Sequence, residues 1–348
     1  MVRLSMRKRN WHLMAKLPIT IATWDYDRVR PIMDGRDKVE GCDVNFITVG
    51  PEECFHRAWN HQEFDVTEIG LSGYIIAVSR GEREFGASPY VAIPVFLSRS
   101  FRCSGIYIRT DRGITQPTDL KGKKIGVPEY QITAAVWSRG FLQDEYGIKV
   151  DDVTWYQGGM DNPGRKDKWP NNLPPNFPLK HLSNVQTLNQ MFKVGELDAL
   201  ICPRTPSSYR DGLTPVSRLF EDFEAVEKSY YRKSLIFPIM HPVGIRRNIH
   251  EANPWLAANL YKAFSEAKKI SQAELFETAA LKIGLPWVVS HAQSSQEILG
   301  SDIFPYGVAA SRPTLDAAVR YAFEQHMAVR HVAVEELFPK TTLDEAKT

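Results

Sequence analysis

Apolar and polar positions alternate along most of the chain in short runs, which take turns with segments of helical periodicity. Alternation predicts strands over Leu17–Trp24 and Val44–Val49, and a third strand is expected over Phe64–Ile69. Helices are expected after the second and third of these strands, at about 52–60 and 72–79. Strands that alternate with helices are typical of an α/β protein with a largely parallel sheet.

A second series of strands and helices is predicted for the middle of the chain. Its expected strands are Gly105–Ile108, the end of 118–127, Val153–Tyr156 and Ala199–Cys202. The spacing of apolar residues predicts a long helix over 132–146, with Gly147 as its stop. Thr187 opens a capping box for a shorter helix. Residues 158–178 are dense in Gly, Pro and Asn, so we expect a long surface loop there.

The last third of the chain begins with an apolar run, 234–240, that predicts a strand, and continues with a helix from Pro254. A tail helix is expected to bury one face, which consists of Leu315, Val319, Ala322 and Phe323. This order of elements predicts two α/β lobes, the second inserted in the first. Lobe 1 is expected to comprise residues 17–100 and 232–348 and lobe 2 residues 101–231, with crossovers near Arg99 and Tyr230.

Two lobes joined in this way form a ligand cleft between them and close on a small ligand there. The basic segment 1–16 is expected to be a disordered leader, with Met6 or Met14 as alternative starts.

Composition narrows the class of protein. Apolar residues make up 43% and charged residues 24% of the chain, which is ordinary for a soluble globular protein. The net charge of +2 gives no excess to hold a polyanion, so nucleic acid is not an expected partner. No run approaches the ~18 apolar residues of a membrane span, and residues 1–16 lack the apolar core of a secretory signal. We therefore expect a cytoplasmic protein, whose four cysteines, without a C-x-x-C pair, are reduced thiols.

Several segments together carry a family resemblance. The most specific is Gly126–Trp137, and it is supported by Ile93–Arg102, Asp302–Gly307, Asp25–Arg28 and Asp65–Glu68. On these segments the chain resembles the 4,5-dihydroxyphthalate decarboxylase family from about residue 17 to about residue 340. The resemblance implies a two-lobed fold like that of type II periplasmic binding proteins. One position departs from the family pattern, because Cys103 stands where a histidine is expected.

The resemblance also implies a reaction, the decarboxylation of a hydroxylated phthalate, foremost of 4,5-dihydroxyphthalate to protocatechuate and CO2. The ring carbon that loses CO2 must be protonated, so a general acid has to reach it. A hydroxyl para to the departing carboxylate supplies electron density, and no cofactor is then needed. Consistent with this, the sequence has no P-loop, no dinucleotide fingerprint and no zinc-protease motif, and we predict neither a cofactor nor a metal site.

Candidate acids are polar side chains at predicted strand ends. His241 follows the apolar run and precedes Pro242, and Glu68 ends the strand 64–69. A buried carboxylic acid can be tuned for proton transfer, so both residues are predicted to be catalytic. Either residue could instead make only structural hydrogen bonds, and the sequence leaves this open.

The substrate's second carboxylate calls for arginine or for free N–H groups at a helix start. Arg28, Arg102 and Arg204 are the candidate clamps, although a surface arginine or a salt bridge between lobes is the alternative for the last two. Catechol hydroxyls suit acidic partners, and a planar ring suits aromatic ones. The remaining predicted substrate-binding residues are Asp25, Ser72, Tyr74, Glu129, Tyr130, Gln131 and Thr133.

Two other classes of function compete with decarboxylation. The same two-lobed architecture serves solute-binding proteins, so a non-enzymatic binder of a small aromatic carboxylate is the main alternative. A biosynthetic enzyme or ligand sensor on the same scaffold is a weaker one. In each case the expected partner is a small aromatic acid, and we also expect a homo-oligomer.

Overall fold

A computed structural model describes residues 15–167 and 172–343, so the predicted leader lies almost wholly outside the described residues. The first sheet has the strand order β2-β1-β3-β11-β4. β1 pairs in parallel with β2 and β3, whereas β11 is antiparallel to both β3 and β4. Its strands are β1 (Leu17–Thr23), β2 (Cys42–Thr48), β3 (Val66–Glu68), β4 (Tyr90–Arg99) and β11 (Ile239–Arg246).

The helices that belong to this part of the chain follow its strands. They are α1 (Arg30–Met33), α2 (Pro51–His61), α3 (Leu71–Val78), α8 (Arg247–Ala252), α9 (Leu256–Glu274), α10 (Val288–Leu299) and α11 (Arg312–Glu324). α2 begins with a proline in its first turn and ends at Gln62 in the left-handed conformation, φ 49°. α3 is almost wholly buried, because nearly all of its side chains are apolar.

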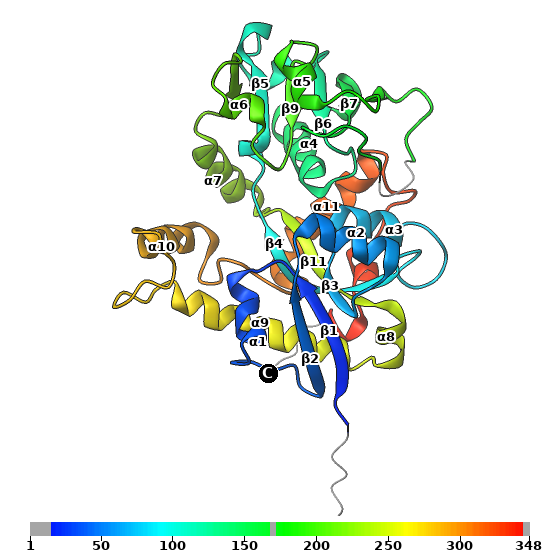
Figure 1. Ribbon diagram of the computed structural model, residues 1–348, viewed down its shortest axis with the longest axis vertical. Coiled ribbons are helices and arrows are strands. Elements are labelled where there is room, and N and C mark those ends of the chain that lie inside the picture. Colours follow the sequence, from blue (N-terminus) through cyan, green and yellow to red (C-terminus); the bar gives the residue numbers. More distant parts are fainter. Residues whose placement is uncertain (1–14, 168–171, 344–348) are drawn as a thin grey trace, which may run out of the picture.

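A second sheet has the order β10-β5-β9-β6-β7-β8, and Figure 1 shows it in the upper part of the molecule, above the first sheet. Its strands are β5 (Ile106–Arg109), β6 (Lys124–Val127), β7 (Thr154–Gln157), β8 (Leu179–His181), β9 (Ala199–Ile201) and β10 (Val216–Arg218). Its helices are α4 (Thr133–Tyr146), α5 (Leu188–Lys193), α6 (Ser207–Arg210) and α7 (Phe223–Ser234). The chain enters this part after β4 and returns through α7 to β11.

Local signals in the sequence explain several of these boundaries. α4 ends at Gly147, whose φ of 63° is the left-handed conformation that glycine adopts without strain. α5 begins after Thr187, whose side chain accepts a hydrogen bond from the backbone N–H of Gln190. Both helices were predicted from these residues.

The strand predicted over 234–240 is wrong. Residue 234 still belongs to α7, and Leu235 ends that helix with a φ of 56°. Phe237 stacks on Phe101 with ring centroids 4.8 Å apart, so the apolar run packs across the crossover between the sheets instead of forming a strand. The strand begins only at Ile239.

The C-terminal helix α11 packs against α4, a helix of the second sheet. Gly140 of α4 makes room for the ring of Tyr321, since a Cβ atom at residue 140 would lie 2.3 Å from a ring carbon. The Arg139 guanidinium donates to Gln325 at 2.8 Å. The predicted apolar face of α11 is correct except for Phe323, which is 46% exposed. The last part of the chain therefore ties the two sheets together.

No helix in the described part of the chain is long and apolar enough to cross a membrane.

Candidate functional site

Glu68 lies at the centre of a hydrogen-bonded cluster at the C-terminal ends of β1 and β3 in the first sheet. It is the last residue of β3 and is fully buried. Trp24 and Tyr26 follow β1, which runs parallel to β3, so both lie at the same end of the sheet as Glu68. The Trp24 backbone N–H donates to Glu68 Oε1 at 2.6 Å, and the Tyr26 hydroxyl donates to Oε2 at 2.9 Å.

His241 completes this cluster from the neighbouring antiparallel strand. It is the third residue of β11, and not the end of a strand as predicted. β11 runs opposite to β3, so the start of β11 meets the end of β3. The ladder between β11 and β4 shifts register around His241 and Pro242, in part because proline has no N–H to donate. His241 Nδ1 lies 2.8 Å from Glu68 Oε2.

One ring nitrogen of His241 is available to a ligand. Nδ1 is occupied by Glu68, which leaves Nε2 free of a protein partner within the described ranges. The Phe55 ring from α2 meets the imidazole edge-on, with centroids 4.7 Å apart. The His241 side chain keeps 16% of its surface exposed, whereas that of Glu68 has none. Of the two predicted acids, only His241 is placed to touch a substrate.

The hydrogen bonds around Glu68 define the charges in the cluster. Three groups point at its two oxygens, and two of them, the Trp24 N–H and the Tyr26 hydroxyl, donate to it. Burial, together with the negative charge of Glu68, holds the pKa of the Tyr26 phenol far above its usual range. Tyr26 therefore remains a donor to Glu68 at any ordinary pH.

Arg28, a predicted carboxylate clamp, supports the cluster from below the tyrosine. Its guanidinium lies over the Tyr26 ring at 4.3 Å and over the Phe304 ring at 4.2 Å. Its Nε donates to the carbonyl of Leu97 at 2.9 Å, and its Nη1 pairs with Asp27 at 2.8 Å. These contacts hold the Tyr26 ring in place, and they occupy the guanidinium.

Arg102 is better placed for a ligand. Its Nε donates to the sulfur of Met240, the residue before His241, at 3.2 Å. Sulfur is a weak acceptor, so this contact satisfies little of the guanidinium. Burial lowers the pKa of Arg102 to about 10, and the nearby carboxylate of Glu227 opposes that shift. Arg102 is thus a cation beside His241 with little direct compensation.

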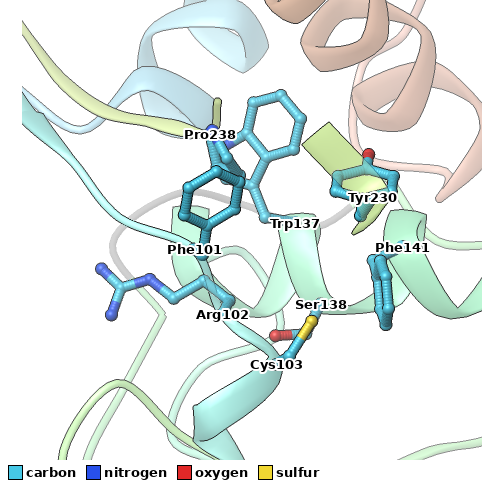
Figure 2. A pocket seen from close by; sticks show the side chains of 8 residues that line it. All are labelled: Phe101, Arg102, Cys103, Trp137, Ser138, Phe141, Tyr230 and Pro238. Atoms are coloured by element: carbon cyan, nitrogen blue, oxygen red, sulfur yellow. The ribbon is translucent and has the colours of Figure 1, made fainter. Parts of the chain in front are cut away.

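The Arg102 backbone also borders a small cavity at the crossover between the sheets. Figure 2 shows the aromatic rings around it, with the Arg102 guanidinium pointing away from them. The cavity measures about 10 Å³, room for no more than a single water molecule. Its lining residues are Phe101, Arg102, Cys103, Trp137, Ser138, Phe141, Tyr230 and Pro238.

Cys103 belongs to this crossover. Its backbone N–H donates to Glu227 at 2.9 Å, and burial raises the pKa of its thiol well above the usual value. A thiol in this state is a neutral, weakly reactive group. Cys103, which stands where a histidine was expected from the sequence, therefore lines the crossover between the sheets.

A larger hollow of about 340 Å³ lies at the opposite end of these strands, where β1 and β2 begin. It is open and is lined by residues such as Thr20, Asp43 and Asp65. Neither hollow includes Glu68 or His241.

The two lobes are in direct contact next to the Glu68 cluster. The Ser72 hydroxyl, at the start of α3, donates to the backbone carbonyl of Gln131 at 2.6 Å and lies 2.9 Å from the hydroxyl oxygen of Thr133. Trp137 of α4 donates to the carbonyl of Ile239 at 2.8 Å. Ser72, Gln131 and Thr133, which were predicted to bind substrate, therefore join the lobes instead, together with Trp137.

Acidic and basic side chains also meet across the lobes. Glu52, in the first turn of α2, lies 3.5 Å from Arg204 and 3.7 Å from Arg165. Arg165 in turn donates to the buried carboxylate of Glu129 at 2.6 Å. Asp25 pairs instead with Arg30 on the surface, at 2.8 Å.

Two predicted ring-binding residues belong to the core. The Tyr74 hydroxyl donates to the carbonyl of Leu337 at 2.7 Å, and the residue is fully buried. Tyr130 is equally buried, with the Arg139 guanidinium 3.8 Å from its ring centroid. Both rings are buried in the core, and the Tyr130 hydroxyl donates across the lobes to the carbonyl of Gln325 at 3.3 Å.

Sequence reasoning missed four residues of this region: Tyr26, Phe55, Glu52 and Arg165. Tyr26 had a signal, since it lies within the segment Asp25–Arg28 just after a predicted strand. The other three had none, because their partners are distant in sequence. In the described part of the chain, no group of three or more His, Cys, Asp or Glu side chains is arranged to hold a metal ion.

Known proteins resemble this chain in sequence along nearly its whole length. A protein from Comamonas testosteroni named 4,5-dihydroxyphthalate decarboxylase is 39% identical over 334 residues, which covers 96% of this chain and all of that protein. A protein of the same name from Pseudomonas putida is 44% identical over 63% of this chain and 83% of its own. A family profile described as NMT1/THI5 like matches residues 89–164.

The fold resembles that of solved binding proteins. The periplasmic sulfonate-binding protein of Methylobacillus flagellatus superposes with a TM-score of 0.52 at 15% identity, covering 93% of this chain and 92% of that one. This likeness confirms the predicted two-lobed α/β fold of the periplasmic-binding-protein type.

Proposed function

The chain belongs to the 4,5-dihydroxyphthalate decarboxylase family, and we propose that it removes one carboxylate from a hydroxylated phthalate. The substrate is a small aromatic diacid, most specifically 4,5-dihydroxyphthalate, and the products are protocatechuate and CO2. The observation that supports this best is the Glu68–His241 pair, in which a buried carboxylate holds the imidazole at 2.8 Å and leaves Nε2 for the substrate.

In the proposed reaction, His241 Nε2 delivers a proton to the ring carbon that bears the departing carboxylate. The bond between that carbon and the carboxylate then breaks, its electron pair returns to the ring, and CO2 leaves. The hydroxyl para to the reacting carbon assists the first step by donating electron density. His241 regains its proton from solvent after the lobes open.

Glu68 acts through His241 as a positioning residue. Its carboxylate fixes the Nδ1–H tautomer and stabilises the imidazolium that donates the proton. The Tyr26 hydroxyl and the Trp24 N–H hold the carboxylate in place at 2.9 and 2.6 Å. Glu68 itself is buried behind the imidazole, so it does not meet the ring of the substrate.

Arg102 is the proposed partner of the carboxylate that reacts. It lies next to Met240 and therefore beside His241. A guanidinium with only a sulfur acceptor gains a charge-assisted hydrogen bond when a carboxylate enters. Closure of the lobes around the diacid then removes water from the reacting groups and aligns them.

The direct experiment is to incubate the purified protein with 4,5-dihydroxyphthalate and to measure CO2 and protocatechuate. His241→Ala is expected to abolish most of the turnover. The variant His56→Ala is a matched control, because His56 lies on the outer part of α2 and its ring contacts Asn60 and His61. Tight binding of the diacid without release of CO2 would instead identify a solute-binding protein, and full turnover in His241→Ala would exclude His241 as the acid.

A further inference from the structure

We propose that Arg165 and Arg204 bind the carboxylate that the substrate retains, and that Glu52 occupies their site when no substrate is present. This inference rests on the proposed function, because it takes an aromatic diacid as the ligand. It assigns the recognition of the second carboxylate to a pair of arginines on lobe 2 and gives Arg165 a role in specificity.

The distances indicate an anion site that is filled imperfectly. Arg165 Nη1 and Arg204 Nη1 converge on the same atom, Glu52 Oε1, at 3.7 and 3.5 Å. Charge-assisted N–H···O hydrogen bonds measure about 2.7–2.9 Å. Both contacts are therefore ion pairs and not hydrogen bonds. A carboxylate that is free to move could approach both guanidiniums more closely than Glu52 does.

Arg165 is oriented for this role by a buried acid. Its Nε donates to Glu129 Oε1 at 2.6 Å, and the Glu129 side chain is only 3% exposed. A guanidinium presents donors along two edges, so the edge with Nε can hold Glu129 while Nη1 faces across to lobe 1. Glu129, predicted from the sequence to bind substrate, thus fixes an arginine that does so.

This pair lies near the His241 cluster. Glu52 and Phe55 are three residues apart on α2, so their side chains lie on the same face of the helix. Phe55 contacts the His241 ring, with centroids 4.7 Å apart. Three residues of helix rise about 4.5 Å. A benzene ring with neighbouring carboxylates can therefore place one of them at His241 and the other toward Arg165 and Arg204.

Charge explains why Glu52 must give way. Glu52 faces both guanidiniums, and Glu129 is hydrogen-bonded to that of Arg165. A substrate carboxylate at the same point would be repelled by Glu52 unless that side chain withdrew. Glu52 can withdraw easily, since it is 50% exposed, whereas the buried Glu129 cannot. Glu52 therefore competes with the substrate carboxylate for the two arginines.

The test measures binding by calorimetry with two probes that do not turn over. Phthalate carries both carboxylates and no hydroxyl, and catechol carries both hydroxyls and no carboxylate. Arg165→Gln is expected to weaken the affinity for phthalate at least about 10-fold, because one charge-assisted hydrogen bond is lost. The affinity for catechol should stay within about twofold of the wild-type value. Glu52→Gln is expected to strengthen phthalate binding, because the competing charge is removed.

Arg57→Gln serves as the matched control, since Arg57 lies on α2 near Glu52 but pairs with Glu53 and Glu63 on the surface. Arg165→Lys keeps the charge and should recover part of the affinity for phthalate. Retained binding of catechol shows that each variant is folded.

Several results would overturn the inference. They are a wild-type protein that does not bind phthalate, an unchanged affinity for phthalate in Arg165→Gln, an equal loss for phthalate and catechol, or weaker phthalate binding in Glu52→Gln. These outcomes are separate from the proposed function. Release of CO2 with unchanged phthalate affinity in Arg165→Gln would refute only the arginine pair, and phthalate binding through Arg165 without release of CO2 would refute only the decarboxylation.

Discussion

Replacement of Glu68 by glutamine tests the link between the buried carboxylate and the imidazole. A glutamine oxygen can keep the hydrogen bond from the Trp24 N–H, which lies 2.6 Å from Glu68 Oε1. The amide nitrogen then faces His241 Nδ1, 2.8 Å from the present Oε2. Because that nitrogen is a donor, Nδ1 must become an acceptor, and the hydrogen bond from the imidazole to the carboxylate is lost.

The size of the effect follows from the bond that is lost. A hydrogen bond to a charged group contributes about 1.5–3 kcal/mol. If this stabilisation acts on the proton donor in the transition state, kcat falls about 10- to 150-fold, at about 1.4 kcal/mol for each factor of ten. KM should change little, because the Glu68 side chain is fully buried behind His241 and does not touch the substrate.

The assay is CO2 release over a range of 4,5-dihydroxyphthalate concentrations up to saturation, which gives kcat and KM for wild type, Glu68→Gln, His241→Ala and the double variant. If Glu68 acts only through His241, the second change adds nothing to the kcat loss of His241→Ala. Additive losses in the double variant would refute this reasoning, since they would mean that Glu68 contributes to catalysis independently. A rise in KM with an unchanged kcat for Glu68→Gln would refute it as well.

Three further outcomes are expected. Tyr26→Phe removes the hydroxyl that donates to Glu68 at 2.9 Å, so kcat should fall by less than in Glu68→Gln, because the carboxylate remains; an equal or larger fall in steady-state assays would contradict this. Burial raises the pKa of Glu227 from 4.5 to about 7, so the contribution of the protonated side chain to stability is lost as the pH rises from about 4.5 to 7. Urea titrations of wild type and Glu227→Gln measure this loss. The unfolding free energy of the variant minus that of wild type should increase over this range by up to about 3 kcal/mol. A difference that is constant with pH would exclude the shift. Gly140→Ala places a Cβ 2.3 Å from a carbon of the Tyr321 ring, so the free energy of unfolding should fall by about 1–3 kcal/mol or more. A raised melting temperature would contradict this, because it would mean that the contact is loose and that only the higher helix propensity of alanine counts.

The sequence alone determined the local elements and the placement of Glu68. Periodicity located α4, Gly147 gave the end of that helix, and Thr187 gave the start of α5. These signals are visible in the sequence because they depend only on neighbouring residues. Glu68 was found because a polar residue at the end of a buried strand is visible without any partner. The likeness to a known family, which extends over 96% of the chain, supplied the fold class and the reaction.

Tertiary structure decided which side chains meet. Tyr26, Glu68 and His241 are far apart along the chain. They come together only because β1 and β3 end at the same end of the sheet where the antiparallel β11 begins. Residues 235–238 were misread as part of a strand because their apolar side chains pack at the crossover between the sheets, and burial of that kind gives no periodic pattern in the sequence. Glu52 and Arg165 belong to different lobes, so their ion pair depends on how the lobes close and not on any spacing in the sequence.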